Sequence, residues 1–174
     1  MRDYQIIILV ASILVFAYLA VFSFVFSHVL DFRRNLNRRE LALAIIESEQ
    51  VNTLASIDEL FKSEGVSYTA EEAALLSSLS SLAFDKPTHD LVIESQERIK
   101  QAKSALSYLA LSNKWAEKAE RYQGLVDVYA DLERFYRQNV ALYNSDVEAY
   151  NYWRSIPGYR PIFHILGFKS RPGI

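Results

Sequence analysis

The stretch IIILVASILVFAYLAVFSFVFSHVL, residues 6–30, decides the architecture of this chain. It contains no Asp, Glu, Lys or Arg, no proline and no glycine, and it is followed by four arginines at Arg33, Arg34, Arg38 and Arg39. A helix that spans a bilayer needs about 20 consecutive apolar residues. Residues 1–30 are therefore predicted to form a transmembrane anchor, with some tilt because the stretch is long.

The arginines also predict an orientation. Arg2 is the only basic residue ahead of the apolar stretch. The more basic flank of a membrane span stays in the cytoplasm. We expect a single-pass protein of the cell (inner) membrane whose N-terminus lies outside and whose residues 31–174 lie in the cytoplasm. The lipid bilayer is then its first partner.

Two other interpretations fit the stretch less well. A cleaved signal peptide has an apolar core of about 7–15 residues with basic residues ahead of it. Here the core is longer, the charges follow it, and the small-x-small pattern Ala42-Leu43-Ala44 lies beyond the arginines. A buried helix of a soluble protein would need other segments to surround side chains that are apolar on every face.

The composition excludes several classes of partner and chemistry and favours a helical fold. Lys plus Arg number 19 and Asp plus Glu number 21, so the net charge is −2, which argues against nucleic acid as a partner. No cysteine is present, which excludes disulfides, thiol catalysis and cysteine-held metals. The 174 residues contain only five glycines and four prolines, and this scarcity favours long helices.

Breaks in the pattern predict where the helices start and stop. No glycine or proline occurs between Phe32 and Gly65, so the anchor helix is expected to continue to Ser63 and to end at that glycine. Thr69-Ala70-Glu71-Glu72 is a capping box. It predicts a helix over 70–84 whose inner face contains Ala73, Leu76, Ser80 and Ala83.

Two further helices are expected. The break Asp85-Lys86-Pro87-Thr88 leads into a helix over 89–110, with an inner face of Val92, Ile99, Ala102, Leu106 and Leu109. After a turn near Asn113, a helix of roughly 40 residues carries a ladder in steps of four and three. Its members are Trp115, Ala119, Tyr122, Val126, Tyr129, Glu133, Tyr136, Val140, Tyr143, Val147 and Tyr150.

These patterns predict an all-α protein in which the transmembrane helix continues into an antiparallel four-helix bundle. The expected divisions are an anchor at 1–30, a cytoplasmic bundle at 31–156 and an irregular tail at 157–174. The tyrosine ladder is interpreted as core, with each hydroxyl near the bundle edge. A ligand slot between the helices is the alternative.

Residues 134–144, RFYRQNVALYN, resemble the C-terminal signature of the LemA family, in which an Arg, paired aromatics, a Val and a Tyr-Asn pair recur on the last long helix. The matching residues are Arg134, Phe135, Tyr136, Val140, Tyr143 and Asn144. The similarity covers roughly residues 105–168, and Arg137 stands where the family has an Asn. The resemblance implies a divergent, membrane-anchored helical protein and supplies no catalytic residues.

No pattern in the sequence indicates catalysis. His28, His89 and His164 are scattered, with no His-x-x-x-His or Glu-x-x-His pair, so the ligands of a di-iron bundle are absent. Glu133 is the one acid on the ladder, and Arg137 one turn later is expected to cover it. We therefore expect a protein that is not an enzyme and that binds no metal or cofactor.

The tail combines apolar and basic residues, and no acid occurs after Glu148. Its basic residues, together with the end of the last helix, are Arg154, Arg160, Lys169 and Arg171. One interpretation is a tail that folds over its own domain. In the other, the last helix returns toward the membrane and brings the tail beside Arg33, Arg34, Arg38 and Arg39, where it makes a second, weak lipid contact.

Two functions are compatible with these features. The first is a non-enzymatic, membrane-tethered scaffold or adaptor that presents its bundle to other membrane or cytoplasmic proteins; the sequence leaves a homo-oligomer open. The second is a sensory bundle that binds a ligand and signals through its anchor helix. The second needs a partner, because 174 residues include no output domain.

Overall fold

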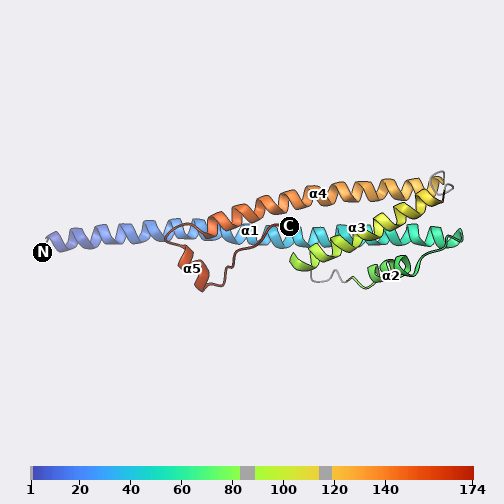
Figure 1. The fold of residues 1–174 in the computed structure, drawn as a ribbon. Helices are drawn as coiled ribbons and strands as arrows, with labels where there is room; N and C mark the ends of the chain where they lie inside the picture. Colours follow the sequence, from blue (N-terminus) through green and yellow to red (C-terminus); the bar gives the residue numbers. More distant parts are fainter. Residues whose placement is uncertain (1, 83–88, 114–118) are drawn as a thin grey trace. The chain divides into compact units, whose positions relative to one another are not determined.

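The computed structural model describes residues 2–82, 89–113 and 119–174. This part of the chain consists of helices joined by turns and irregular segments, and it contains no strand. Its helices are α1 (Arg2–Ser63), α2 (Ala70–Leu79), α3 (His89–Ser112), α4 (Glu120–Arg154) and α5 (Arg160–Ile165) (Figure 1). The predicted all-α class is thereby confirmed.

The first helix, α1, is uninterrupted over 62 residues, because no glycine or proline breaks it. It ends as predicted, with Gly65 at φ +74°. The Gly65 amide donates to the Lys62 carbonyl at 3.1 Å and the Val66 amide to the Phe61 carbonyl at 3.0 Å. This pair of bonds is a Schellman motif, which satisfies carbonyls at the end of a helix.

The N-terminal part of α1 is long and apolar enough to cross a membrane, judged by length and composition. An 18-residue window within it has a mean hydropathy of 2.8 and is 0% buried. Every residue from 4 to 21 is exposed. The core helix of a soluble protein would be mostly buried, so this part of α1 is a candidate membrane span.

In α2 the predicted capping box is confirmed, but the helix is shorter than predicted and buries a different set of residues. The Glu72 amide donates to the Thr69 hydroxyl at 3.3 Å, and the Thr69 amide donates to the Glu72 carboxylate at 2.8 Å. The helix ends at Leu79, earlier than the expected 84. Four serine hydroxyls bond carbonyls three residues back and compete with helical bonds; they belong to Ser77, Ser78, Ser80 and Ser81.

The buried residues of α2 are Leu76 and Leu79. Ala73 and Ser80, which were predicted to face inward, are exposed. The larger side chains gain more from burial than an alanine or a serine does. Residues 83–88, including Ala83 and the predicted break Asp85 to Thr88, lie outside the described residues.

The inner faces of α3 and α4 are confirmed where the structure describes them. All five predicted residues of α3 are buried: Val92, Ile99, Ala102, Leu106 and Leu109. On α4 the ladder is buried or half-buried from Ala119 to Tyr150, and Trp115 lies outside the described residues. The helix is shorter than predicted, at 35 residues.

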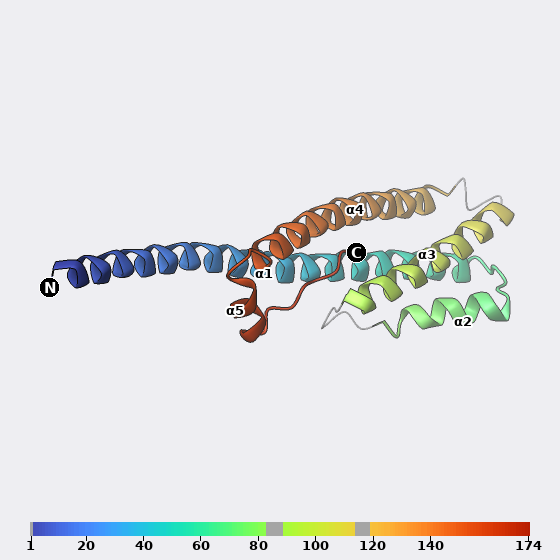
Figure 2. The same cartoon turned by 60° about the vertical axis from the view of Figure 1, so that its left-hand side comes forward.

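The chain separates into two compact units, which are described separately. Unit 1 comprises Met1–Asn37 with Asn144–Gly173, and unit 2 comprises Arg38–Tyr143 with Ile174. In unit 2 the core joins α1, α2, α3 and α4 through Phe61, Leu79, Leu106 and Tyr129, among others. Figure 2 shows α2 and α3 together against the C-terminal part of α1.

Within unit 2, α4 runs in the opposite direction to α1. The Phe61 and Tyr122 rings stack at 5.7 Å near the end of α1. The Tyr143 hydroxyl, on the C-terminal side of α4, donates to the Glu40 carboxylate at 3.1 Å. The ladder from Tyr122 to Tyr143 therefore faces α1, and its tyrosines are part of the core of unit 2.

Replacing Tyr129 by alanine should destabilise the chain strongly. Tyr129 is 5% exposed and belongs to the core cluster, and removing a buried aromatic ring costs about 3 kcal/mol or more. Chemical unfolding of the full chain in detergent micelles, followed by circular dichroism, measures the loss.

The matched control is Tyr108→Ala on α3. Tyr108 is 69% exposed, so its removal should change the free energy of unfolding by less than about 0.5 kcal/mol. Equal losses at both tyrosines would mean that the ladder does not form the core.

Candidate functional site: a polar groove on unit 2

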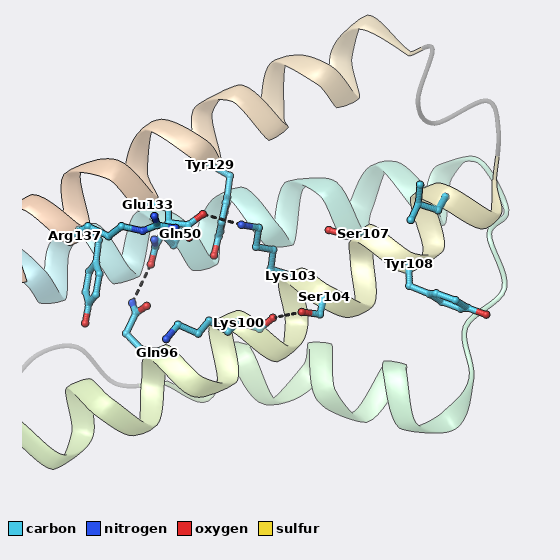
Figure 3. Close-up of a pocket in the computed structure, with 12 residues that line it drawn as sticks. Gln50, Gln96, Lys100, Lys103, Ser104, Ser107, Tyr108, Tyr129, Glu133 and Arg137 are labelled. Carbon is cyan, nitrogen blue, oxygen red and sulfur yellow. Dashed lines mark hydrogen bonds and ion pairs between the residues drawn. The ribbon is translucent and has the colours of Figure 1, made fainter. Parts of the chain in front are cut away.

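An open groove of about 750 Å³ lies between α1, α3 and α4 in unit 2. Figure 3 shows Lys100 and Lys103 on α3, Glu133 and Arg137 on α4, and Gln50 on α1 around this space. Further lining residues are Gln96, Ser104, Ser107, Tyr108, Leu111, Tyr129 and Tyr136. Its volume is within the range of small-molecule sites, about 300–1,000 Å³.

One side of the groove holds a charged triad. Lys103 Nζ lies 2.7 Å from Glu133 Oε2 and 4.9 Å from the centre of the Tyr129 ring. Arg137 forms an ion pair with the other oxygen of Glu133. Hydrogen bonds from Lys103 and Arg137 hold the pKa of Glu133 below its usual range. The predicted cover of Glu133 by Arg137 is therefore confirmed, and Lys103 is a partner that the sequence did not reveal.

Beneath the groove lies a buried polar cluster that joins α1 to α3. The Ser95 hydroxyl donates to Glu47 Oε2 at 2.9 Å, and the Gln96 amide nitrogen donates to Gln50 Oε1 at 3.0 Å. Glu47 is 1% exposed, and the three partners are also buried. The core of unit 2 is thus apolar around α2 and polar beneath the groove.

The carboxyl of Glu47 is the unusual group of this cluster. Burial raises its pKa above the usual range, against the opposing effect of Ser95, Gln96 and Tyr136. Burial, and then Glu47 itself, raise the pKa of the Tyr136 hydroxyl. Within the described part of the chain, neither Glu47 Oε1 nor the Tyr136 hydroxyl has a hydrogen bond of standard geometry. Burial therefore favours a protonated Glu47, which keeps its charge out of the interior.

The groove suits an anion better than a cation. Lys100, Lys103 and Arg137 outnumber Glu133, the acid in its lining, and glutamine amides and serine hydroxyls add neutral hydrogen-bonding groups. No group of three or more His, Asp or Glu side chains able to hold a metal occurs among the residues that the structure describes. The net positive charge of this lining fits the binding of an anionic molecule.

Glu47 and Gln50 were not identified from the sequence, although the signal was present. On α1 the buried positions Leu43, Glu47, Gln50, Leu54 and Ile57 follow the same steps of four and three as the ladder on α4. Extending that pattern to the first helix would have placed both polar residues inside.

Unit 1 contains a second ordered surface, where the tail packs on the apolar part of α1. The Tyr159 ring lies 5.1 Å from Tyr18 and 5.6 Å from Phe22. Phe163 of α5 lies 6.1 Å from Phe22 and 6.3 Å from Phe26, and Phe163 is fully buried. The tail therefore folds onto its own unit, as one of the two interpretations expected.

Hydrogen bonds fix the rest of the tail to the end of α4. The Asn151 amide donates to the Arg171 carbonyl at 2.8 Å and accepts the Arg171 amide at 3.1 Å. The Tyr150 hydroxyl donates to the Lys169 carbonyl at 3.0 Å. These hydrogen bonds join the tail to α4, and the tail includes the short helix α5.

The basic residues predicted near a membrane divide between the units. In unit 1, the Arg33 guanidinium lies 5.0 Å from the Phe168 ring, Arg34 pairs with Asp31 at 3.8 Å, and Arg171 donates to Asn37 at 2.9 Å. The tail thus lies beside Arg33, as its return along α4 predicted. The others are Arg38 (exposed) and Arg39 (half-buried) in unit 2, and Arg154 (half-buried), Arg160 (exposed) and Lys169 (exposed) in unit 1.

The residues of the LemA-like signature have different environments. Tyr136 and Tyr143 are buried, and Val140 and Asn144 are half-buried. Arg134 is exposed and pairs with Asp131 at 3.3 Å, and Phe135 is exposed. The signature therefore supplies core residues together with an exposed aromatic ring.

Comparison of this chain with protein-family models, with curated proteins and with solved structures found no match. The resemblance to the LemA family rests on the residues quoted for it above.

Replacing Glu47 by glutamine should stabilise the chain at neutral pH. Because folding raises the pKa of Glu47, the folded chain binds more protons than the unfolded one between the two pKa values, and Glu47's contribution to stability falls as pH rises there. The melting temperature of Glu47→Gln near pH 7 should exceed that of the wild type by about 2–4 °C, the effect of about 1 kcal/mol. Near pH 4 the difference should vanish.

The control, Glu133→Gln, has the opposite sign. In the wild type, Lys103 and Arg137 lower the pKa of the Glu133 carboxyl. The ionised Glu133 therefore stabilises the folded chain at neutral pH, and this contribution is lost in acid. Glu133→Gln should melt lower than the wild type near pH 7. A Glu47→Gln difference that does not change with pH would show that Glu47 is not buried as described.

Proposed function

We propose that this protein is a non-enzymatic, membrane-tethered scaffold or adaptor, LemA-like in plan, in which α1 anchors an antiparallel four-helix bundle that binds other proteins. In this proposal the anchor lies in the cell (inner) membrane, with the N-terminus outside and the bundle in the cytoplasm. The observation that carries it is an exposed apolar stripe on α4.

The stripe consists of Val128, Phe135 and Leu142, each seven residues after the previous one. Their exposed fractions are 50%, 55% and 47%. Residues seven apart lie on nearly the same side of a helix, which is the spacing that packs one helix against another in a coiled coil. The core of unit 2 uses the neighbouring ladder through Tyr129, Tyr136 and Tyr143, so the stripe is free for a helix of a partner protein.

Support for the membrane anchor comes from the exposure of α1. An apolar helix exposed from residue 4 to residue 21 would be costly in water, since each large side chain gains about 1.5–3 kcal/mol on leaving it. At 1.5 Å per residue this segment is about 27 Å long, close to the hydrocarbon thickness of about 30 Å. The arginines that follow support the cytoplasmic orientation of the bundle.

A second function is favoured by the groove. Its volume of about 750 Å³ and its lining of Lys100, Lys103 and Arg137 suit a small anionic ligand. Since α1 lines this groove through Gln50 and also forms the proposed anchor, a ligand would act on the helix that enters the membrane. This alternative is a single-pass sensory bundle that signals to a partner through its anchor.

The orientation predicts which engineered cysteines react in intact cells. The chain has no cysteine of its own, and Ser63 is exposed at the end of α1. A Ser63→Cys variant should resist a membrane-impermeant maleimide in intact cells and react after lysis. Tyr4→Cys, at the other end of the span, should react in intact cells. The reverse pattern would place the bundle outside.

The stripe predicts where a partner can be crosslinked. A photoreactive benzoylphenylalanine replacing Phe135 or Leu142 in the full chain should form a discrete adduct when cells are irradiated. The adduct's mass separates a second copy of this chain from a different protein. The same group replacing Ala141, which is also exposed on α4 but turned away from the stripe, should form no such adduct. Equal adducts at all three positions, or none, would contradict the scaffold proposal.

A further inference from the structure

The strongest unassigned feature of unit 1 is a basic cavity at the tail. It has a volume of about 340 Å³ and is lined by Arg154 at the end of α4 and by Arg160, Pro161 and His164 of α5. Three of its four lining side chains can donate hydrogen bonds from nitrogen, and two are permanently charged guanidinium groups. Such a set recognises a phosphate, because guanidinium groups match its oxygens in a forked geometry.

The guanidinium groups of this cavity have donors left over. Arg154 Nη1 donates to the Phe168 carbonyl at 3.3 Å, while the buried Nε has no hydrogen-bond partner among the described residues. Within the described part of the chain, no carboxylate forms an ion pair with Arg154 or Arg160. The sequence explains this, since no acid follows Glu148. The positive charge is therefore left for a ligand to neutralise.

The position of the cavity on α1 indicates where that ligand comes from. Tyr159 and Phe163 hold α5 against Tyr18, Phe22 and Phe26, which belong to the apolar stretch. Along α1, the fully exposed segment stops at residue 21, and Phe22 is the first half-buried residue. If that segment fills the hydrocarbon core, α5 lies where the core ends and lipid phosphates begin.

The outer surface of α5 also suits a membrane boundary. Ile165 is 83% exposed and Leu166 is 51% exposed, directly after His164 of the basic cavity. An element with apolar side chains beside clustered cations is typical of segments that lie in the headgroup region. Trp153, which stacks on His28 at 4.7 Å and precedes Arg154, is a residue type enriched at the same depth.

We propose that Arg154, Arg160 and His164 form a binding site for the phosphate of an anionic phospholipid headgroup. The site rests on the proposed membrane anchor, since the anchor places α5 at the interface. The lipid's phosphate oxygens accept hydrogen bonds from the two guanidinium groups and the imidazole, and its acyl chains lie along the exposed side chains of Ile165 and Leu166.

Native mass spectrometry of the full chain, released from detergent micelles after titration with phosphatidylglycerol, tests the site. The wild type should retain one lipid at concentrations where phosphatidylcholine is not retained. Arg160→Gln, which leaves the Arg154 bond to Phe168 intact, should weaken retention about tenfold, the effect expected for a charge-assisted contact of about 1.4 kcal/mol. Arg160→Lys should recover part of the loss.

Lys169→Gln is the matched control. Lys169 is a basic, exposed residue of the same tail that does not line the cavity. The Tyr150 hydroxyl bonds to the backbone carbonyl of Lys169, so this hydrogen bond survives the substitution. Lys169→Gln should change retention less than twofold. Equal losses for Lys169→Gln and Arg160→Gln would show diffuse attraction and overturn the site.

Two further measurements separate the possible failures. If inorganic phosphate or glycerol 1-phosphate competes with the lipid at equal concentration, the site is one for soluble anions and the lipid proposal is overturned. Flotation of the wild type and Arg160→Gln with neutral phosphatidylcholine vesicles reports on the anchor alone, and both should float. Loss of selective retention with flotation intact refutes the headgroup site, whereas failure to float refutes the anchor on which it rests.

Discussion

The continuity of α1 is the constraint on which the rest of the structure depends. Each compact unit contains a segment of this single helix, and in each unit the other elements pack on that segment. In unit 2, α1 contributes Leu54 and Phe61 to the apolar core and Glu47 and Gln50 to the polar cluster. In unit 1, it contributes Phe22 and Phe26 to the contacts with the tail. The same helix therefore supplies a packing surface to each unit.

The polar cluster of unit 2 is costly unless its groups are satisfied, because a buried carboxylate without partners loses far more solvation than one hydrogen bond returns. Glu47 meets this cost through Ser95 and a raised pKa, while the amides of Gln50 and Gln96 bond to each other. A leucine at any one of these positions would leave the hydrogen-bonding partner of the replaced residue buried and unsatisfied. The cluster thus fixes one pairing of α1 with α3, the role best established for buried polar residues in helical assemblies.

The features that the sequence predicted are those encoded locally. Gly65 ends α1 and Thr69 caps α2 because each needs only its own neighbours in the chain, and the ladder on α4 is a repeat along one helix. The features that it did not predict depend on a second element. The bond between Lys103 and Glu133 joins α3 to α4. The packing of Phe163 on Phe22 also joins two elements, and the sequence left the fold of the tail as one of two alternatives. The early end of α2 was not predicted either, and its buried face is formed by Leu76 and Leu79 rather than by smaller residues.

The apolar stretch at 6–30 was predicted as one anchor, and the structure divides it into two environments. Up to residue 21 every position is exposed, whereas Val25 and Val29 are buried by the protein itself. A stretch longer than the hydrocarbon core must tilt or find other apolar cover for its excess. Here the aromatic rings of Tyr159, Phe163 and Phe168 supply that cover. The last turns of the proposed anchor are therefore covered by protein on one side, where Val25 and Val29 are buried, while Phe24 stays 58% exposed. This cover reduces the apolar length that tilt would otherwise have to accommodate.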